Sequence, residues 1–227
     1  MSIGKIVKSD SHINYVCQIH GPREVDTEPS PTDYAFGRFV RVALRSGLVD
    51  SSPLDFRQQE PVSYAVGIIY DTILVNPAYG SLGPRLSNET QVELFSPDYI
   101  SEKAILTYVM ILGMVEQQSQ INGTPTLPTI MHGVPSLSLE LGSTIETMTD
   151  EEIRAFHFFS DPEEAGHQDR YLHMGYLPHI IAQRNSLLPM VTLRIIEQLE
   201  RLFPQNMALL SIVKRNFAWR LKVETAG

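Results

Sequence analysis

Four histidines in the second half of the sequence have the clearest potential for chemistry. His132 and His157 bracket a segment of serines, a glycine turn and several acidic residues, and His173 and His179 lie six residues apart, a spacing that places them on one face of a continuous strand. Histidine titrates near neutral pH and can act as a general acid or base. A histidine-lined pocket would therefore suit a small hydrolase or ligand-binding enzyme, which we keep as an alternative hypothesis.

No nucleophile or metal motif accompanies these histidines. Ser136, Ser138 and Ser143 lack the strand-to-helix context of a G-x-S-x-G nucleophile, and Cys17 has the apolar neighbours of a buried strand thiol. No H-E-x-x-H pattern occurs. His157 closes a short expected helix, whose negative end favours a protonated imidazole without any catalytic role. We therefore predict no catalytic residue, no cofactor and no metal ligand.

The charge of the chain limits the classes of partner. The formal net charge of −8 lacks the broad basic footprint that phosphate-backbone binding requires, which argues against direct nucleic-acid binding. Residues 140–170 hold nine acidic residues against two arginines, whereas residues 184–222 hold seven basic residues against two glutamates. These regions are either two solvated faces or an acidic surface that meets a basic tail within or between subunits.

The basic tail contains the residues that we expect to bind a partner. In the segment KRNFAWRLK (214–222), the candidates are Arg215, Phe217, Trp219 and Arg220, because arginine and aromatic side chains dominate protein interfaces. In the plainer interpretation, the aromatic rings pack on the core and the cations stay in solvent. A third hypothesis is that the tail stacks on nucleic-acid bases, with affinity that falls steeply as salt rises.

The elements that would position these residues are mainly strands. Residues 103–116 are apolar without alternation, which predicts a strand buried on both faces. A strand is also expected at 137–145, and another within residues 170–181. Short strands with period-two alternation or β-branched residues are expected at 3–7, 13–19, 37–44 and 63–75.

Helices are expected in the second half. Thr149 and Glu152 have the spacing of a capping box, which predicts a short helix to about Phe159. Apolar residues recur at helical spacing from Leu187 to Phe203 and again from Met207 to Trp219, with Pro204 between the two stretches. We predict a β-barrel over residues 1–182 with long rim loops, and an α-helical hairpin over 183–227 that packs on it. The loops expected include 46–61, 76–97 and the proline-containing stretch 125–135.

The expected compartment depends on the short apolar runs of the sequence and on its single cysteine. The longest apolar run, residues 104–115, is well short of the roughly 20 residues that cross a bilayer, and the first residues do not form an apolar signal region. The single cysteine, Cys17, cannot form an internal disulfide. We expect a cytoplasmic protein with no membrane association.

Six segments follow one another within residues 3–177: IGKIVKSDSHINYV, GRFVRVAL, AVGIIYDTILV, KAILTYVMILGMVE, LELGSTIETMTDEEIRAF and YLHMGYL. Their order resembles the HAS barrel, which HerA-type DNA-translocase ATPases share with ATP-synthase subunits. The resemblance implies ring assembly and, as in HerA, docking of a NurA-type nuclease. It does not imply ATPase activity, because the sequence passes to the helical hairpin where HerA-type proteins continue into a motor with a phosphate-binding loop.

The sequence thus predicts a mainly β protein (α+β overall): a HAS-type β-barrel with a short helix and a C-terminal helical hairpin. Its expected function is non-catalytic assembly with itself, as a homo-oligomer, or with a HerA-like ATPase or nuclease system. The barrel rim and the hairpin are the expected binding surfaces.

Overall fold

The strands of the protein form one main sheet, seen in a computed structural model that describes residues 1–21, 24–44, 63–75, 104–116, 128–159, 171–183 and 185–225. Strand 63–75 has the predicted bounds, and strand 104–116 differs from its prediction by one residue. The strands of the sheet are β1 (Ser2–Ser9), β2 (Asn14–Ile19), β3 (Phe39–Leu44), β4 (Ser63–Val75), β5 (Ala104–Glu116), β6 (Thr129–His132) and β7 (Thr144–Thr147).

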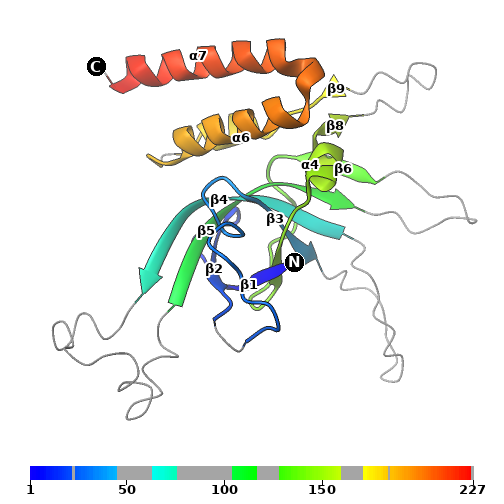
Figure 1. Cartoon of the computed structure of the whole chain (residues 1–227), viewed down its shortest axis with the longest axis vertical. Helices are drawn as coiled ribbons and strands as arrows, with labels where there is room; N and C mark the ends of the chain where they lie inside the picture. Colours follow the sequence, from blue (N-terminus) through cyan, green and yellow to red (C-terminus); the bar gives the residue numbers. More distant parts are fainter. Residues whose placement is uncertain are drawn as a thin grey trace, which may run out of the picture.

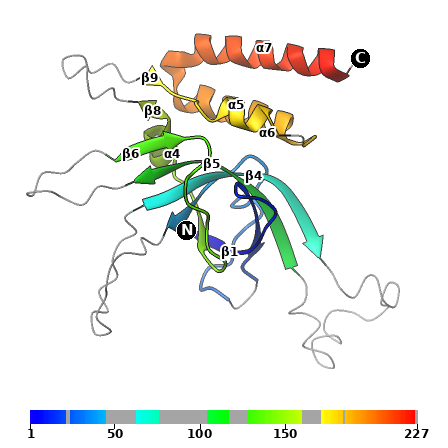
Figure 2. The same cartoon turned by 180° about the vertical axis from the view of Figure 1, so that it is seen from behind.

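Six of these strands close into a barrel. The order β2-β1-β7-β3-β4-β5 is antiparallel throughout, and β2 also pairs with β5, which joins the two ends of the sheet. One edge of β5 is shared: its residues 106–110 pair with β2, and its residues 113–116 pair with β6. The length of β5 therefore lets it close the barrel and also extend the sheet beyond it (Figures 1 and 2).

The interior of the barrel is filled by apolar side chains from all six strands. This packing explains why Cys17 is a buried thiol: burial raises its pKa to about 12, so it is not a nucleophile at neutral pH. The buried residues of the barrel core are Ile3, Ile6, Tyr15, Cys17, Ile19, Val40, Val42, Leu44, Ala65, Ile69, Val109, Ile111, Met114 and Ile145.

A layer of helices covers the outer face of β4 and β5. Val66 and Leu112 point outward into a second core, which α6 completes with residues such as Val191 and Ile195. In both views α6 lies between the barrel and α7 (Figures 1 and 2). The strand β5 is thus buried on both faces, as its unbroken apolar run predicted. The helices are α4 (Asp150–His157), α5 (Leu177–Ile181), α6 (Leu188–Leu202), η1 (Pro204–Asn206) and α7 (Met207–Thr225).

The helix α4 begins at the predicted capping box. The Glu152 backbone N–H donates to the Thr149 hydroxyl, and the Thr149 N–H donates to the Glu152 carboxylate. Arg41 on β3 then ties this helix to the barrel, because it forms ion pairs with both Glu146 on β7 and Glu152. The start of α4 is therefore fixed against two neighbouring strands.

Three details of the sequence interpretation were wrong. The strand expected at 137–145 begins only at Thr144, because Gly133 and Gly142 adopt positive φ angles of 109° and 80° and turn the chain. The strand expected within 170–181 is limited to β9 (Tyr171–Leu172), which pairs with β8 (Phe158–Phe159). The helix α5 begins at Leu177, with Pro178 in its first turn. The four-residue strand β6 was placed in a loop.

The helical hairpin at the end of the chain was predicted correctly. The expected apolar stripe of α6 is buried, and Pro204 separates α6 from α7. None of the helices in the described ranges is long and apolar enough to span a membrane. The rim loops expected at 46–61 and 76–97 lie outside the described residues.

Candidate functional site

Three of the four histidines come together between β6, α4 and the segment before α5. The His132 and His173 rings stack with their centroids 4.5 Å apart, and the His132 and His157 centroids are 6.0 Å apart. Tyr176, at the start of α5, is also in this cluster, 5.2 Å from the His132 ring. The folded chain therefore gathers residues that are distant in sequence. The hydrogen bonds of their rings decide whether they can exchange protons or bind a metal.

His157 is completely buried and both of its ring nitrogens are engaged. Nδ1–H donates to the Ile153 carbonyl oxygen at 2.7 Å, so Nε2 carries no proton and accepts from the Tyr176 hydroxyl at 2.7 Å. Burial lowers the pKa of His157 to about 3 and raises that of Tyr176. The expectation of a protonated His157 was wrong, because loss of solvation outweighs the helix dipole.

His132 is held in the same neutral form. Nε2–H donates to the Phe156 carbonyl oxygen at 2.9 Å, and Nδ1 accepts from the Gly175 backbone N–H at 3.0 Å. Burial lowers the pKa of His132 to about 4. Neither this ring nor that of His157 has a free lone pair with which to accept a proton or bind a metal. Together they join β6, α4 and the chain before α5.

His179 has a different position from the other three. It lies on α5, where burial lowers its pKa and a hydrogen bond to the Ile111 backbone opposes that shift. Ile111 is the point on β5 where pairing passes from β2 to β6. This hydrogen bond connects α5 to the part of β5 where the pairing changes, while the buried Nε2 of His179 has no hydrogen-bond partner among the described residues. Across the described ranges, no group of His, Cys, Asp and Glu side chains has an arrangement that could hold a metal ion.

The four residues predicted to bind a partner lie on α7 and differ in exposure. Trp219 is 68% exposed, Arg215 is exposed, and Phe217 is partly buried. Arg220 lies in the helix, with its side chain outside the described part of the structure. The interpretation in which both aromatic rings pack inward therefore fails for Trp219.

A row of apolar side chains accompanies Trp219 on the outer face of α7. Leu209 is 50% exposed and Ile212 is 56% exposed, and Asn216 is exposed between them and Trp219. The inner face of the helix is a different one, where Leu210 is fully buried. We call Leu209, Ile212, Asn216 and Trp219 the α7 outer row. Sequence reasoning missed Leu209 and Ile212, although the signal was present, since α7 is apolar on two faces rather than one.

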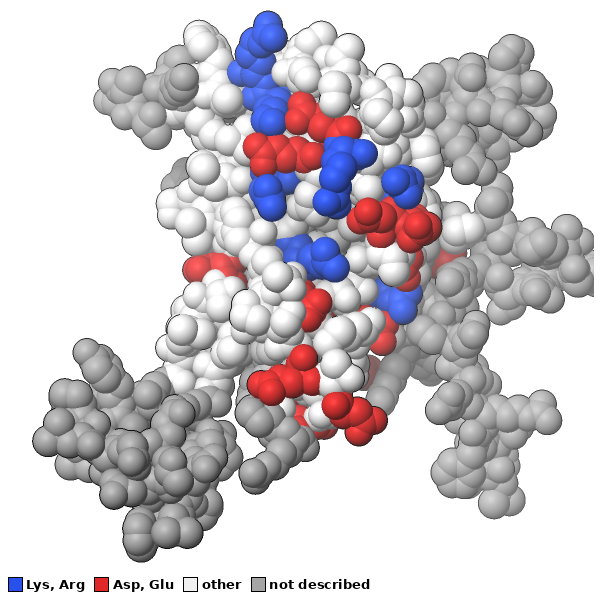
Figure 3. Space-filling model, in the orientation of Figure 1, with Lys and Arg blue, Asp and Glu red and all other residues white. Residues whose placement is uncertain are grey.

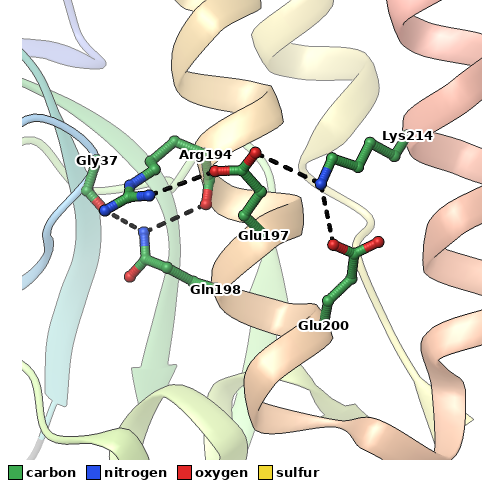
Figure 4. A network of polar contacts seen from close by, with 6 residues as sticks. All are labelled: Gly37, Arg194, Glu197, Gln198, Glu200 and Lys214. Carbon is green, nitrogen blue, oxygen red and sulfur yellow. Dashed lines mark hydrogen bonds and ion pairs between the residues drawn. The ribbon is translucent and has the colours of Figure 1, made fainter.

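The backbone of α7 is held in place by α6, whose own contacts reach the barrel. The Gln198 side-chain amide donates to the Gly37 carbonyl oxygen at 2.5 Å (Figure 4). Gly37 has a φ of +78°, and a Cβ at this position would lie 2.5 Å from Cγ of Arg194, so α6 requires a glycine here. This contact fixes α6 against the loop that leads into β3.

A second set of polar contacts joins α7 to α6. Lys214 Nζ lies 3.0 Å from Glu200 Oε2 and 3.4 Å from Glu197 Oε1, and these carboxylates raise the pKa of Lys214 (Figure 4). The Ser211 hydroxyl also donates to Glu200, at 3.2 Å. Arg215, the next residue after Lys214, makes no ion pair with any other described residue. The charge of Lys214 is thus paired within the chain, whereas the neighbouring Arg215 is exposed.

Charge is unevenly distributed over the face of the molecule in Figure 3. Lysine and arginine side chains gather over the helical layer, interleaved with acidic ones, and acidic side chains mark the opposite end of the barrel. The basic region 184–222 of the sequence contains α6 and most of α7. On α7, exposed Leu209, Ile212 and Trp219 are apolar, and Arg215 is exposed beside them.

Comparison with protein families gives a match over almost the whole chain. The family model described as "Domain of unknown function (DUF8166)" matches residues 1–226. No curated protein matches the chain.

Proposed function

This chain belongs to the DUF8166 family, and we propose that it is a non-catalytic assembly protein with a HAS-type barrel that presents a docking helix, α7. The docking surface is the α7 outer row. The partner we propose is a protein of DNA processing, in the class of HerA-like motor ATPases and their nucleases, which is the class that the sequence resemblance implies.

The exposure of the α7 outer row is the observation that carries this proposal. Burying one large apolar side chain contributes about 1.5–3 kcal/mol, so a helix that leaves three of them in water favours a partner that covers them. The row is also preorganised, because Lys214 and Glu200 hold α7 on α6. A rigid, mainly apolar row that includes an exposed tryptophan is typical of interface hot spots.

The hydrogen bonds of His132 and His157 support a non-catalytic role for these two residues over the hydrolase alternative. Acid–base catalysis needs a ring nitrogen that can exchange a proton with substrate, whereas both nitrogens of His132 and of His157 are bonded within the chain. The barrel interior is filled by apolar side chains, and such a filled core offers a substrate no space among them.

The charge of the molecule weighs against the nucleic-acid hypothesis. The net charge is −8, and Lys214, one of the cations of the tail, is paired with two glutamates. Phosphate binding depends on several free cations acting together. We therefore place a protein, rather than DNA or RNA, on α7.

The experiment that tests this proposal is affinity capture of the full chain from nuclease-treated lysate of its native cells, with wild type beside three variants. Trp219→Ala and the double variant Leu209→Ala/Ile212→Ala alter the α7 outer row. Leu141→Ala, at a residue 72% exposed on the loop before β7, is the matched control. Bound proteins are identified and quantified by mass spectrometry.

We expect a stoichiometric motor ATPase or nuclease with wild type and with Leu141→Ala, and at least a tenfold loss with both α7 variants, the size of effect usual for hot-spot truncation. Recovery of the bait alone, or equal recovery of a partner by all four proteins, would overturn the proposal.

A further inference from the structure

We propose that the segment which docks on α7 is an amphipathic helix of a different protein, with acidic residues beside its apolar stripe. This inference rests on the proposed function of α7, and it adds the shape and charge of the partner. It follows from the spacing of the α7 outer row, from the charge beside the row, and from the poor fit of a second copy of this chain.

The spacing of the row fits a helix. Leu209, Ile212, Asn216 and Trp219 are separated by three, four and three residues. This is the spacing of the core positions of a coiled coil, in which the facing helix supplies side chains that fill the holes between them. A strand or an irregular loop would match only part of such a row. The single polar member, Asn216, would fix the register of the two helices.

The charge beside the row selects an acidic partner. Arg215 is exposed and makes no ion pair within the described residues, while its neighbour Lys214 is neutralised by Glu197 and Glu200. In the sequence Arg220 and Lys222 follow on the same helix, and Glu224 is the only acidic residue of α7. In coiled coils, charges next to the apolar positions set partner choice. Acidic residues at those positions of the partner would complement α7.

A second copy of the chain fits this surface poorly. In a parallel pair, position 215 of each copy would face position 220 of the other, and arginine at both positions places like charges across the helix pair, which is destabilising. In an antiparallel pair that aligns the two rows, Asn216 of each copy would face Ile212 of the other. That arrangement buries two polar side chains against apolar ones without matched hydrogen bonds. Both arrangements favour a different protein as the partner.

The single tryptophan of the chain makes a direct test possible, because its fluorescence reports only on the α7 outer row. The probes are two synthetic helical peptides with the same heptad pattern of leucine and isoleucine. One peptide has glutamate at the flanking positions and the other has lysine. The full chain is titrated with each peptide at low and at high salt, while the wavelength of maximum Trp219 emission is followed.

We expect the glutamate peptide to shift the emission to shorter wavelength in a saturable manner, with at least tenfold tighter binding than the lysine peptide at low salt. The difference should shrink at high salt, since ions screen exposed charges. The variant Arg215→Glu should reduce the preference for the glutamate peptide at least tenfold. Lys5→Glu, at an exposed position of β1, makes the same change in net charge and should leave the preference unchanged.

Three outcomes would overturn this inference. Binding of neither peptide would exclude a helix, and equal binding of both would exclude selection by charge. An emission shift that appears on raising the concentration of the protein alone, together with a doubled mass in light scattering, would show that the occupant is a second copy. The capture experiment with the α7 variants does not depend on the peptides. A failure of this inference would therefore leave the proposed function of α7 intact.

Discussion

At the scale of single residues, the His157–Tyr176 hydrogen bond shows how a potentially catalytic group becomes structural. A neutral imidazole with a donor on one side and an acceptor on the other matches the Ile153 carbonyl and the Tyr176 hydroxyl. Water has no access to the ring, because His157 is completely buried. Burial therefore keeps His157 from acting as an acid or base, and it also makes the stability of the fold depend on pH under acidic conditions.

We predict that acid destabilises the protein through His157. The pKa is about 3 in the folded chain, against the ordinary value of 6.5 expected on unfolding. The folded state favours the neutral ring, so the contribution of His157 is complete above pH 6.5 and is lost as pH falls from 6.5 towards 3. At pH 5 the loss is about 2 kcal/mol for this one group. Urea unfolding at pH 7.5 and at pH 5 measures it.

The variant His157→Gln serves as the comparison for that experiment. It should be less stable than wild type at neutral pH, because it cannot reproduce both hydrogen bonds. Its stability should also fall less on going to pH 5, with His132 accounting for part of the remaining loss, since the pKa of His132 is about 4. An equal fall in both proteins would show that His157 is not the group that titrates.

At the scale of elements, α7 has two apolar faces with different roles, and neighbouring residues separate them. Leu210 is fully buried against α6, whereas Leu209 is 50% exposed in the outer row. We predict that Leu210→Ala lowers the free energy of unfolding by about 2–5 kcal/mol, and that Leu209→Ala changes it by less than about 1 kcal/mol. Thermal or urea unfolding of the two variants measures the difference. Similar losses in both would mean that the outer row is part of the core.

The elements also show what the sequence can and cannot reveal. The unbroken apolar run of β5 and the β-branched residues of β4 predicted both strands nearly to the residue, because these patterns are local in the sequence. The strand β6 has only four residues, and it exists because β5 offers it a free edge, which is a contact between distant parts of the chain. The closure of β2 on β5 is equally non-local. Such pairings leave no periodicity in the sequence.

The candidate site likewise contains some residues that the sequence could predict and others that only the tertiary structure brings together. Trp219 and Arg215 could be picked out by residue type alone, since exposed aromatic and arginine residues mark interfaces. The gathering of His132, His157 and Tyr176 depends on the tertiary structure, and so does their neutral state. The hydrogen-bond partners of a histidine, which decide whether it can react, are set only when strands and helices have packed.

At the scale of the whole molecule, the barrel and the helical layer share β4 and β5. Alternate residues of these strands face the barrel core and the helix core, as Ile69 and Ile68 do. The predicted boundary after residue 182 therefore runs through packed structure: α6, after the boundary, buries Val191 and Ile195 against residues that precede it. One pair of strands couples the two cores, so neither core can lose its packing without exposing a face of the other.

This coupling predicts a single unfolding transition for the whole molecule. Cys17, the only cysteine, is buried in the barrel core, so its reaction with a thiol reagent reports opening of the barrel, while circular dichroism in the helical band reports the helices. Both signals should have the same urea midpoint, as two-state unfolding requires. Val42→Ala in the barrel and Ile195→Ala in α6 should each lower the two midpoints together. A helical signal that is lost before Cys17 becomes reactive would mean that α6 and α7 unfold as a separate unit, and that the barrel is stable without them.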